Sequence, residues 1–284
     1  MNGNQPTALI TGTSSGFGLL AAVELARRGY RVAATMRDVS RNNLLLEAAA
    51  QAGAIENIHC LQVDVTDASS IQLAVQTVWQ TYGRLDVLVN NAGYALGGFT
   101  EEIAMEAWRQ QLETNVFGTI AVTKAALPLM REAGRGTIIN ISSVSGRFAL
   151  PAFAPYATSK FAIEGFSEAL RLEMRPFGVR VVLVEPGPYR TDIWAKGFAG
   201  FAAKENSPYK AELEAILRYA RRTAEASPDP VEVAQLIARI AEHPQPKLRY
   251  PIGRQAALML WLKERLPWRW VEAILLRELK RQQR

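Results

Sequence analysis

Short apolar runs alternate with longer helical patterns along this chain, and that alternation constrains the fold more than any other feature. Seven runs rich in β-branched and aliphatic residues predict strands at 8–11, 31–36, 58–64, 85–90, 137–142, 179–185 and 248–252. Helical patterns lie between them at 17–28, 44–53, 69–82, 105–132, 155–177 and 231–242. Unbroken aliphatic runs are typical of strands buried on both faces of a parallel sheet. The sequence therefore predicts one α/β domain, a doubly wound parallel sheet of about seven strands with helices on both faces.

Two segments depart from this alternation. Residues 188–230 carry scattered aromatic side chains without a clear strand pattern, and a segment of that length inside a compact domain is typical of a lid over a binding site. Residues 254–284 have a basic, Trp-rich helical pattern. We therefore expect a core of residues 1–253 that includes the lid at 188–230, followed by a helical extension at 254–284 of the same domain.

Composition excludes several kinds of site. The single cysteine, Cys60, excludes an internal disulfide, and two histidines, His59 and His243, are too few for a Cys/His metal cluster. Carboxylate metal sites are not excluded by this count, but no metal is expected. The first residues lack a signal-peptide pattern, and no apolar run reaches the roughly 20 residues of a membrane-spanning helix. These observations predict a cytoplasmic protein.

A glycine-rich turn follows the first predicted strand. The segment from Thr11 to Gly18 reads T-G-T-S-S-G-F-G and continues into a predicted helix. Glycines allow a tight turn and close approach of a ligand, and the start of a helix offers unpaired N–H groups to an anion. The spacing differs from the common G-x-G-x-x-G dinucleotide fingerprint, and a simple strand-to-helix connection is the alternative interpretation.

Six motifs in a fixed order resemble the classical short-chain dehydrogenase/reductase family over roughly residues 7–192. The glycine turn is followed by Asp64-Val65, Asn90-Asn91-Ala92-Gly93, Asn115, Ser143 with Tyr156-x-x-x-Lys160, and Pro186-Gly187 with Thr191. The resemblance implies a Rossmann-type fold, hydride transfer with a nicotinamide dinucleotide, and a homodimer or homotetramer. The cofactor-binding residues that it implies are Gly12, Thr13, Ser14, Ser15, Gly16, Phe17, Gly18, Asp64, Val65, Asn91, Ala92, Gly93, Tyr156, Lys160, Pro186, Gly187 and Thr191.

Tyr156 and Lys160 lie four residues apart, which places both on one face of the predicted helix. A phenol with a pKa near 10 is a poor base at neutral pH, and a neighbouring ammonium group favours the phenolate. We therefore expect Lys160 to lower the pKa of Tyr156, which exchanges a proton with the substrate oxygen. The resemblance implies that Ser143 hydrogen-bonds the same oxygen and that Asn115 holds a water of the proton relay.

The residues that end the second predicted strand favour NADP(H) over NAD(H). An acidic residue at this place accepts the ribose hydroxyls of NAD, but here Met36 and then Arg37 occupy it. A guanidinium group suits a 2′-phosphate through charge-assisted hydrogen bonds, so Arg37 is included among the cofactor-binding residues. The alternative is a solvated turn in which Asp38 neutralises Arg37.

The aromatic residues near the expected site predict a lipophilic substrate. Phe148 and Phe153 lie between Ser143 and Tyr156, and Tyr189 and Trp194 belong to the lid, so these six residues form the expected substrate site. The chain looks most like the steroid- and retinol-dehydrogenase-like branch of the family, which implies carbonyl reductase activity on a ketone or aldehyde, or oxidation of its alcohol. The competing hypothesis is an NADP-binding regulator or scaffold with little turnover.

The positive charge lies at one end of the sequence. Residues 247–284 contain ten Lys and Arg against three Asp and Glu, a net charge of +7, whereas the other residues contain 23 and 24. Apolar residues recur there at helical spacing: Trp268, Val271, Leu275 and Leu279. This helix either makes a peripheral contact with an anionic membrane or packs on the substrate cleft or a second subunit. No nucleic-acid partner is expected, because no recognised binding motif accompanies the charge.

Overall fold

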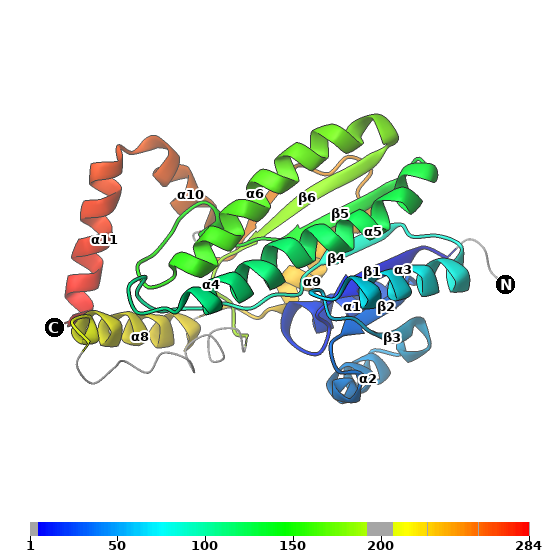
Figure 1. The fold of residues 1–284 in the computed structure, drawn as a ribbon, viewed down its shortest axis with the longest axis horizontal. Coiled ribbons are helices and arrows are strands. Elements are labelled where there is room, and N and C mark those ends of the chain that lie inside the picture. The colour runs from blue at the N-terminus through cyan, green and yellow to red at the C-terminus, as the bar shows by residue number, and fades with distance from the viewer. Residues whose placement is uncertain (1–4, 192–206, 226, 255, 284) are drawn as a thin grey trace.

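The computed structural model describes residues 5–191, 207–225, 227–254 and 256–283 (Figure 1). Within them, one seven-stranded sheet has the strand order β3-β2-β1-β4-β5-β6-β7, and every neighbouring pair is parallel. The strands are β1 (Thr7–Thr11), β2 (Arg31–Met36), β3 (Ile58–Gln62), β4 (Val87–Asn90), β5 (Gly136–Ile141), β6 (Val179–Pro186) and β7 (Arg249–Ile252). The predicted doubly wound sheet is confirmed, with strand ends that differ from the prediction by at most two residues.

Helices cover both faces of this sheet (Figure 1). They are α1 (Gly16–Arg27), α2 (Asn43–Gln51), α3 (Ala68–Tyr82), α4 (Met105–Leu112), α5 (Gly118–Glu132), α6 (Ala154–Met174), α8 (Lys210–Glu225), α9 (Val231–Glu242), α10 (Ala256–Arg265) and α11 (Trp268–Gln283). Successive residues of β1 face opposite layers: Ala8 and Ile10 pack with α1 and α9, and Leu9 packs with α3, α5 and α6. Burial on both sides explains why the strands lack polar alternation.

The strand order reverses direction beside β1, which pairs with β2 on one side and β4 on the other. In doubly wound sheets, the connections on the two sides of such a point leave in opposite directions and open a crevice at the carboxyl ends of the strands. The glycine-rich turn leaves β1 at this crevice, and the loop after β4 leaves it from the neighbouring strand.

The single helix expected at 105–132 is divided by a π-helical turn, Glu113–Phe117. Asn115 lies in this turn, is buried, and bonds the backbone of Tyr94. Such a turn shifts the helical register by one residue and is frequent at functional sites. The tertiary contact to Tyr94 is what periodicity in the sequence cannot reveal.

Helices α8, α10 and α11 lie at the end of the molecule that holds the C-terminus (Figure 1). The predicted lid contributes α8, which packs against α11, while residues 192–206, including Trp194, lie outside the described residues. The basic extension forms α10 and α11. Among the helices that the structure describes, none combines the length and the apolar character needed to cross a membrane.

Candidate active site

The glycine-rich turn, called the cradle here, packs tightly against neighbouring backbone on one side and faces open space on the other. Gly12 has a φ of +72°, and a Cβ there would lie 2.8 Å from Cα of Ala92. At Gly18, a Cβ would collide with the carbonyl oxygen of Gly12, so α1 packs directly on the turn. Gly16 has a φ of +61° and faces open space at the start of α1. This arrangement fits the pyrophosphate of a dinucleotide, which needs close backbone approach and free N–H groups.

Asn91 and Thr11 fix this turn from below. The Nδ2 of Asn91 donates to the carbonyl oxygens of Thr11 and Gly12, each at 2.9 Å. In return, Oγ1 of Thr11 accepts from the backbone N–H groups of Asn91 and Ala92, each at 3.0 Å. The predicted N-N-A-G motif is therefore brought against the glycine turn, and the side chain of Asn91 braces the cradle.

Thr13 is turned away from the cradle, contrary to its expected cofactor contact. Its backbone N–H and its hydroxyl both donate to the carbonyl oxygen of Thr35, at 3.0 and 3.1 Å, and its side chain is buried. A residue whose donors are both used by β2 has none left for a ligand. Ser14 and Ser15, in contrast, are half-buried at the mouth of the turn.

Asp64 and Val65 follow β3 at the same edge of the sheet. Oδ1 of Asp64 accepts from the N–H and hydroxyl of Thr66 at 2.9 and 2.7 Å. Burial opposes the charged form, but these bonds and the nearby Arg37 charge outweigh it and lower the pKa of Asp64. Val65 is buried against Gly118, where a Cβ would lie 2.8 Å from its Cγ2. Asp64 is thus ionised and faces the same region as Arg37.

Ser143, Tyr156 and Lys160 meet beyond the carboxyl end of β5. Ser143 caps the 3₁₀ turn Val144–Gly146, and its Oγ accepts from the N–H of Ser145 at 3.1 Å. Tyr156 and Lys160 come from the first turns of α6, and Nζ of Lys160 lies 5.7 Å from the centre of the Tyr156 ring. All three side chains are buried.

Burial, rather than the lysine charge, dominates the protonation of this group. It raises the pKa of Tyr156 to about 12, and only a hydrogen bond with Ser143 opposes it. It also lowers the pKa of Lys160 to about 8, against the charge of Glu164. The expectation that Lys160 lowers the pKa of Tyr156 is not met, because Nζ is directed to the carbonyl oxygen of Ile141 at 2.8 Å. The phenol therefore stays protonated at neutral pH.

Asn115 connects the loop after β4 to α6. Its Oδ1 accepts from the N–H of Tyr94 at 3.1 Å, and its Nδ2 donates to the carbonyl oxygen of Tyr94 at 2.9 Å and to Oγ of Ser159 at 3.1 Å. Gly93 passes so close that a Cβ would lie 2.9 Å from Oδ1. The side chain of Asn115 is fully engaged in positioning this loop. The water-holding role stays a prediction.

The expected substrate residues occupy different surroundings. Phe148 packs with Leu260 of α10 and Val271 of α11, whereas Phe153 packs with Ile216 of α8. Tyr189 was expected in the pocket, and this is wrong: it is 1% exposed, and its hydroxyl donates to Glu232 at 3.1 Å. Its ring meets Phe17 edge-to-face at 5.6 Å, so both aromatic rings are packing residues.

The last motif of the resemblance, Pro186-Gly187 with Thr191, begins beside Ser143. The carbonyl oxygen of Pro186 accepts from Oγ of Ser143 at 3.4 Å, and the N–H of Gly187 donates to the carbonyl oxygen of Ile252 at 2.8 Å. Thr191 is half-buried at the last described position before 192–206. The structure thus brings all six motifs to one edge of the sheet, five of them around the ends of β1, β4, β5 and β6 and Asp64-Val65 at the end of β3.

A model of the short chain dehydrogenase family matches residues 6–200 of this sequence. The chain belongs to that family. It is 47% identical to the uncharacterized oxidoreductase YusZ of Bacillus subtilis (strain 168) over 97% of this chain and 99% of that protein. The 3-ketodihydrosphingosine reductase of Bacteroides thetaiotaomicron is 37% identical over 86% and 87% of the two lengths. Human 17-beta-hydroxysteroid dehydrogenase type 1 is 38% identical over 85% and 76%.

Solved structures agree with this assignment. A short-chain dehydrogenase from Streptomyces avermitilis matches with a TM-score of 0.79 at 32% identity, over 98% of this chain and 97% of that one. ElxO with NADP bound matches with a TM-score of 0.75 at 26% identity, over 89% and 99%. An enzyme of Burkholderia phymatum in complex with NAD has a TM-score of 0.79 at 25% identity, over 93% and 94%. The protein is an oxidoreductase whose fold binds nicotinamide cofactors.

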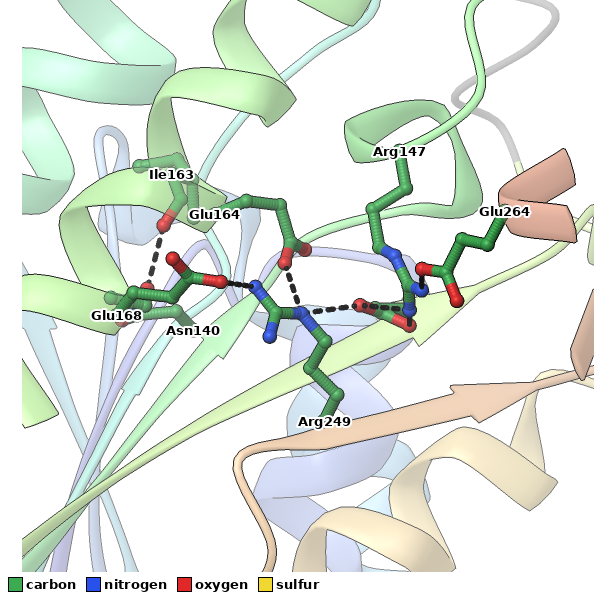
Figure 2. A network of polar contacts seen from close by, with 9 residues as sticks. Asn140, Arg147, Ile163, Glu164, Glu168, Arg249 and Glu264 are labelled. Carbon is green, nitrogen blue, oxygen red and sulfur yellow. Dashed lines mark hydrogen bonds and ion pairs between the residues drawn. The ribbon is translucent and has the colours of Figure 1, made fainter. Parts of the chain in front are cut away.

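A buried ion network behind the active site of this dehydrogenase has no counterpart in the sequence motifs (Figure 2). Glu185, at the end of β6, is fully buried and lies 3.2 Å from the guanidinium groups of both Arg147 and Arg249. Arg249 also pairs with Glu164 of α6 at 2.8 Å, and Arg147 pairs with Glu264 of α10. The network therefore connects the Ser143 loop, the catalytic helix, two strands and the extension. A lone glutamate ending an apolar strand was the only signal of it in the sequence.

Two further polar residues support the loop after β4 and were missed by sequence reasoning. Gln111 is fully buried, its Nε2 donates to the carbonyl oxygen of Tyr94 at 2.9 Å, and its Oε1 accepts from the N–H of Leu96 at 2.6 Å. Ser159 donates to the carbonyl oxygen of Tyr156 at 2.7 Å and accepts from Asn115. A polar residue inside a helical pattern gives no sign of such a contact.

Proposed function

We propose that the protein is an NADP(H)-dependent oxidoreductase that interconverts a lipophilic ketone or aldehyde and its alcohol. The observation that carries the proposal is the convergence of Ser143, Tyr156 and Lys160 beside a cradle with the shape for a dinucleotide pyrophosphate. Both parts are needed for hydride chemistry on a carbonyl.

The protonation of the site supports reduction. When bound, the nicotinamide ring exchanges a hydride with the substrate carbon. Tyr156 donates a proton to the carbonyl oxygen, since burial with a pKa of about 12 keeps its phenol protonated at neutral pH. The hydroxyl of Ser143 donates a hydrogen bond to the same oxygen. Lys160, whose Nζ donates to the carbonyl oxygen of Ile141 next to the ring, would hold the ribose of the bound cofactor, as the family resemblance implies.

The preference for NADP(H) is supported by the end of β2. Arg37 is exposed, while Met36 before it is buried and offers no carboxylate to ribose hydroxyls. The carboxylate of Asp38 accepts from the N–H and hydroxyl of Ser40 at 3.0 and 2.6 Å, so its polar contacts are local. A guanidinium that is open to solvent is suited to a 2′-phosphate. Solved relatives with NADP and with NAD exist, and charge is what favours NADP here.

The substrate class is supported by apolar side chains around the loop between Ser143 and Tyr156. Phe99 and Leu150 pack with Phe153, and Leu150 also packs with Phe148. Two of the relatives carry names that specify a sphingoid ketone and a steroid. Lipophilic carbonyl compounds are the substrates we infer, and the steroid-like branch is favoured by the second of these names.

The test is consumption of NADPH by the purified protein with a panel of steroid, sphingoid and aliphatic ketones and aldehydes. Tyr156→Phe should reduce turnover by about three orders of magnitude while NADPH binding is retained, because only the transferred proton is lost. Tyr82→Phe, at the end of α3, is the matched control and should match the wild type. Binding of NADPH without turnover across the panel would support the regulator or scaffold instead.

Cofactor choice is tested separately. Arg37→Met should raise the KM for NADPH about tenfold and leave the KM for NADH unchanged, because one charge-assisted contact is removed. Equal effects on both cofactors would contradict the preference.

A further inference from the structure

The outer side of α10 exposes a row of apolar side chains. Leu258, Trp261 and Leu262 are 56%, 49% and 38% exposed, and Arg265 completes the row. Their spacing of three and four residues places them on one face of the helix. The opposite face is covered, since Ala256 and Leu260 are buried. A helix that is apolar on both sides is typically covered on both, and here the fold itself covers one.

The following helix is packed on one side and carries exposed apolar side chains around the rest of its surface. Val271 of α11 is buried against Leu260 and Phe148. Trp268, Trp270, Ile274 and Leu276 are each at least half exposed. Trp268 was expected on the same face as Val271 and Leu275, but the structure separates them. Val271 and Leu275 join the packed cluster, and the side chain of Leu279, the fourth residue of the expected face, lies outside the described residues.

Cations are interleaved with these exposed apolar residues. The guanidinium group of Arg265 lies 4.3 Å from the centre of the Trp261 ring, which is a cation–π contact. Arg269, Arg277, Lys280 and Arg281 are exposed on α11. Residues 258–281 contain six Lys and Arg against three Glu, a net charge of +3, within a segment 247–284 of net charge +7. Exposed tryptophans beside basic side chains are characteristic of helices that lie in the interfacial region of a membrane.

We propose that the terminal face, formed by the exposed side chains of α10 and α11 from Leu258 to Arg281, binds the headgroup region of an anionic lipid bilayer. The apolar side chains enter the interface, and the cations contact the anionic headgroups. Each Lys or Arg near such a surface strengthens binding roughly fivefold, and each side chain moved into the interface adds to this.

Charge complementarity selects this occupant over a second copy of the chain. A two-fold symmetric contact places the same patch on both partners. The cations of one terminal face would then meet those of the other, and like charges across an interface disfavour association. An anionic bilayer has the opposite charge and the same combination of polar and apolar layers.

The position of the terminal face gives it a consequence for substrate access, and this step rests on the proposed function. Its inner side packs on Phe148, five residues after Ser143, and Glu264 of α10 pairs with Arg147 of the same loop. The membrane-facing helices are thus the outer cover of the loop that leads to the active site. A lipophilic substrate dissolved in the bilayer would reach the pocket beside this cover.

The experiment is co-sedimentation of the full chain with vesicles of phosphatidylcholine alone and of an equimolar mixture of phosphatidylcholine and phosphatidylglycerol. The wild type should pellet with the mixed vesicles, and high salt should release it. Arg265→Gln with Arg277→Gln should weaken binding about 25-fold, and Trp261→Ser with Leu262→Ser about tenfold or more. The matched controls are Arg109→Gln with Arg175→Gln, and Leu73→Ser with Leu172→Ser, exposed residues on α3, α4, α6 and the turn after it. They should pellet like the wild type.

Three results would overturn the proposal. They are equal pelleting with both kinds of vesicle, no pelleting with either, and self-association in sedimentation velocity that the Trp261→Ser, Leu262→Ser variant abolishes. The last would identify a second copy as the occupant. Reduction of a water-soluble carbonyl compound is measured on the same preparations. A wild type that pellets with the mixed vesicles but has no such activity would contradict the proposed function alone. A wild type that is active but does not pellet would contradict the membrane surface alone.

Discussion

The active-site end and the terminal face place their polar and apolar side chains in opposite environments. Around Tyr156, polar and charged groups are buried and paired with backbone or with one another, as in Lys160 with Ile141 and Asn115 with Tyr94. On α10, apolar side chains such as Leu258 and Trp261 are left in solvent. Buried polar groups that are hydrogen-bonded fix one geometry, whereas exposed apolar groups gain free energy only when a partner covers them. The first region is organised before any ligand arrives, and the second is completed by association.

The largest expected effect concerns the cradle. Gly18→Ala places a Cβ against the carbonyl oxygen of Gly12, and the backbone of the turn must move to relieve this collision. We expect NADPH affinity to fall about 100-fold, measured by fluorescence titration, with a lower melting temperature. Gly165→Ala, on α6, points its Cβ into open space and should bind NADPH like the wild type. Unchanged affinity in Gly18→Ala would show that the active-site end is not rigidly organised.

The buried carboxylate should give a pH-dependent stability. Burial and then the charge of Glu164 raise the pKa of Glu185 from 4.5 to about 7, although Arg147 and Arg249 oppose this. Between these pH values the folded protein retains a proton that the unfolded chain releases, so stability falls as pH rises through the window, by up to about 3 kcal/mol. Urea unfolding of Glu185→Gln should remove this decline. Glu168 also pairs with Arg249 but is 56% exposed, so Glu168→Gln should keep the decline in stability. Parallel curves of stability against pH for Glu185→Gln and the wild type would contradict the prediction.

The two sides of α10 should differ in stability. Leu260→Ala removes a side chain that is 2% exposed and should cost about 2–3 kcal/mol in the free energy of unfolding. Leu258→Ala, at 56% exposure two residues away, should stay within about 0.5 kcal/mol. Chemical unfolding in the absence of lipid measures both. A large effect at Leu258 would mean that the outer side is already covered in solution.

The smallest expected effect is at the link between the two regions. Glu264 pairs with Arg147 but is half exposed, so Glu264→Gln should cost less than about 1 kcal/mol. Glu272→Gln, at an exposed position of α11, is its control and should have no measurable effect. A loss of several kcal/mol in Glu264→Gln would show that the extension and the active site form one cooperative unit.

Much of the fold, and the meeting of most predicted site residues at one edge of the sheet, could be predicted from the sequence. Aliphatic runs such as β6 identify strands buried on both faces, and ordered motifs bring the glycine turn, Ser143 and Tyr156 to one edge of a parallel sheet. What failed was the direction of individual side chains. Thr13 and Tyr189 point into packing contacts, with Thr35 and with Glu232. Lys160 points to Ile141 rather than determining the pKa of Tyr156.

By itself, the sequence determined the strands and helices, the position of each motif along the chain and the location of the positive charge. These depend on local periodicity and residue type. Only the tertiary structure decided which polar groups are buried together and which apolar groups remain exposed. The pairing of Glu185 with Arg147 and Arg249 joins residues far apart in the chain. The division of α11 into a packed side at Val271 and an open side at Trp270 likewise depends on where Phe148 lies. Burial and pairing are properties of the surroundings, and distant segments of the chain supply those surroundings.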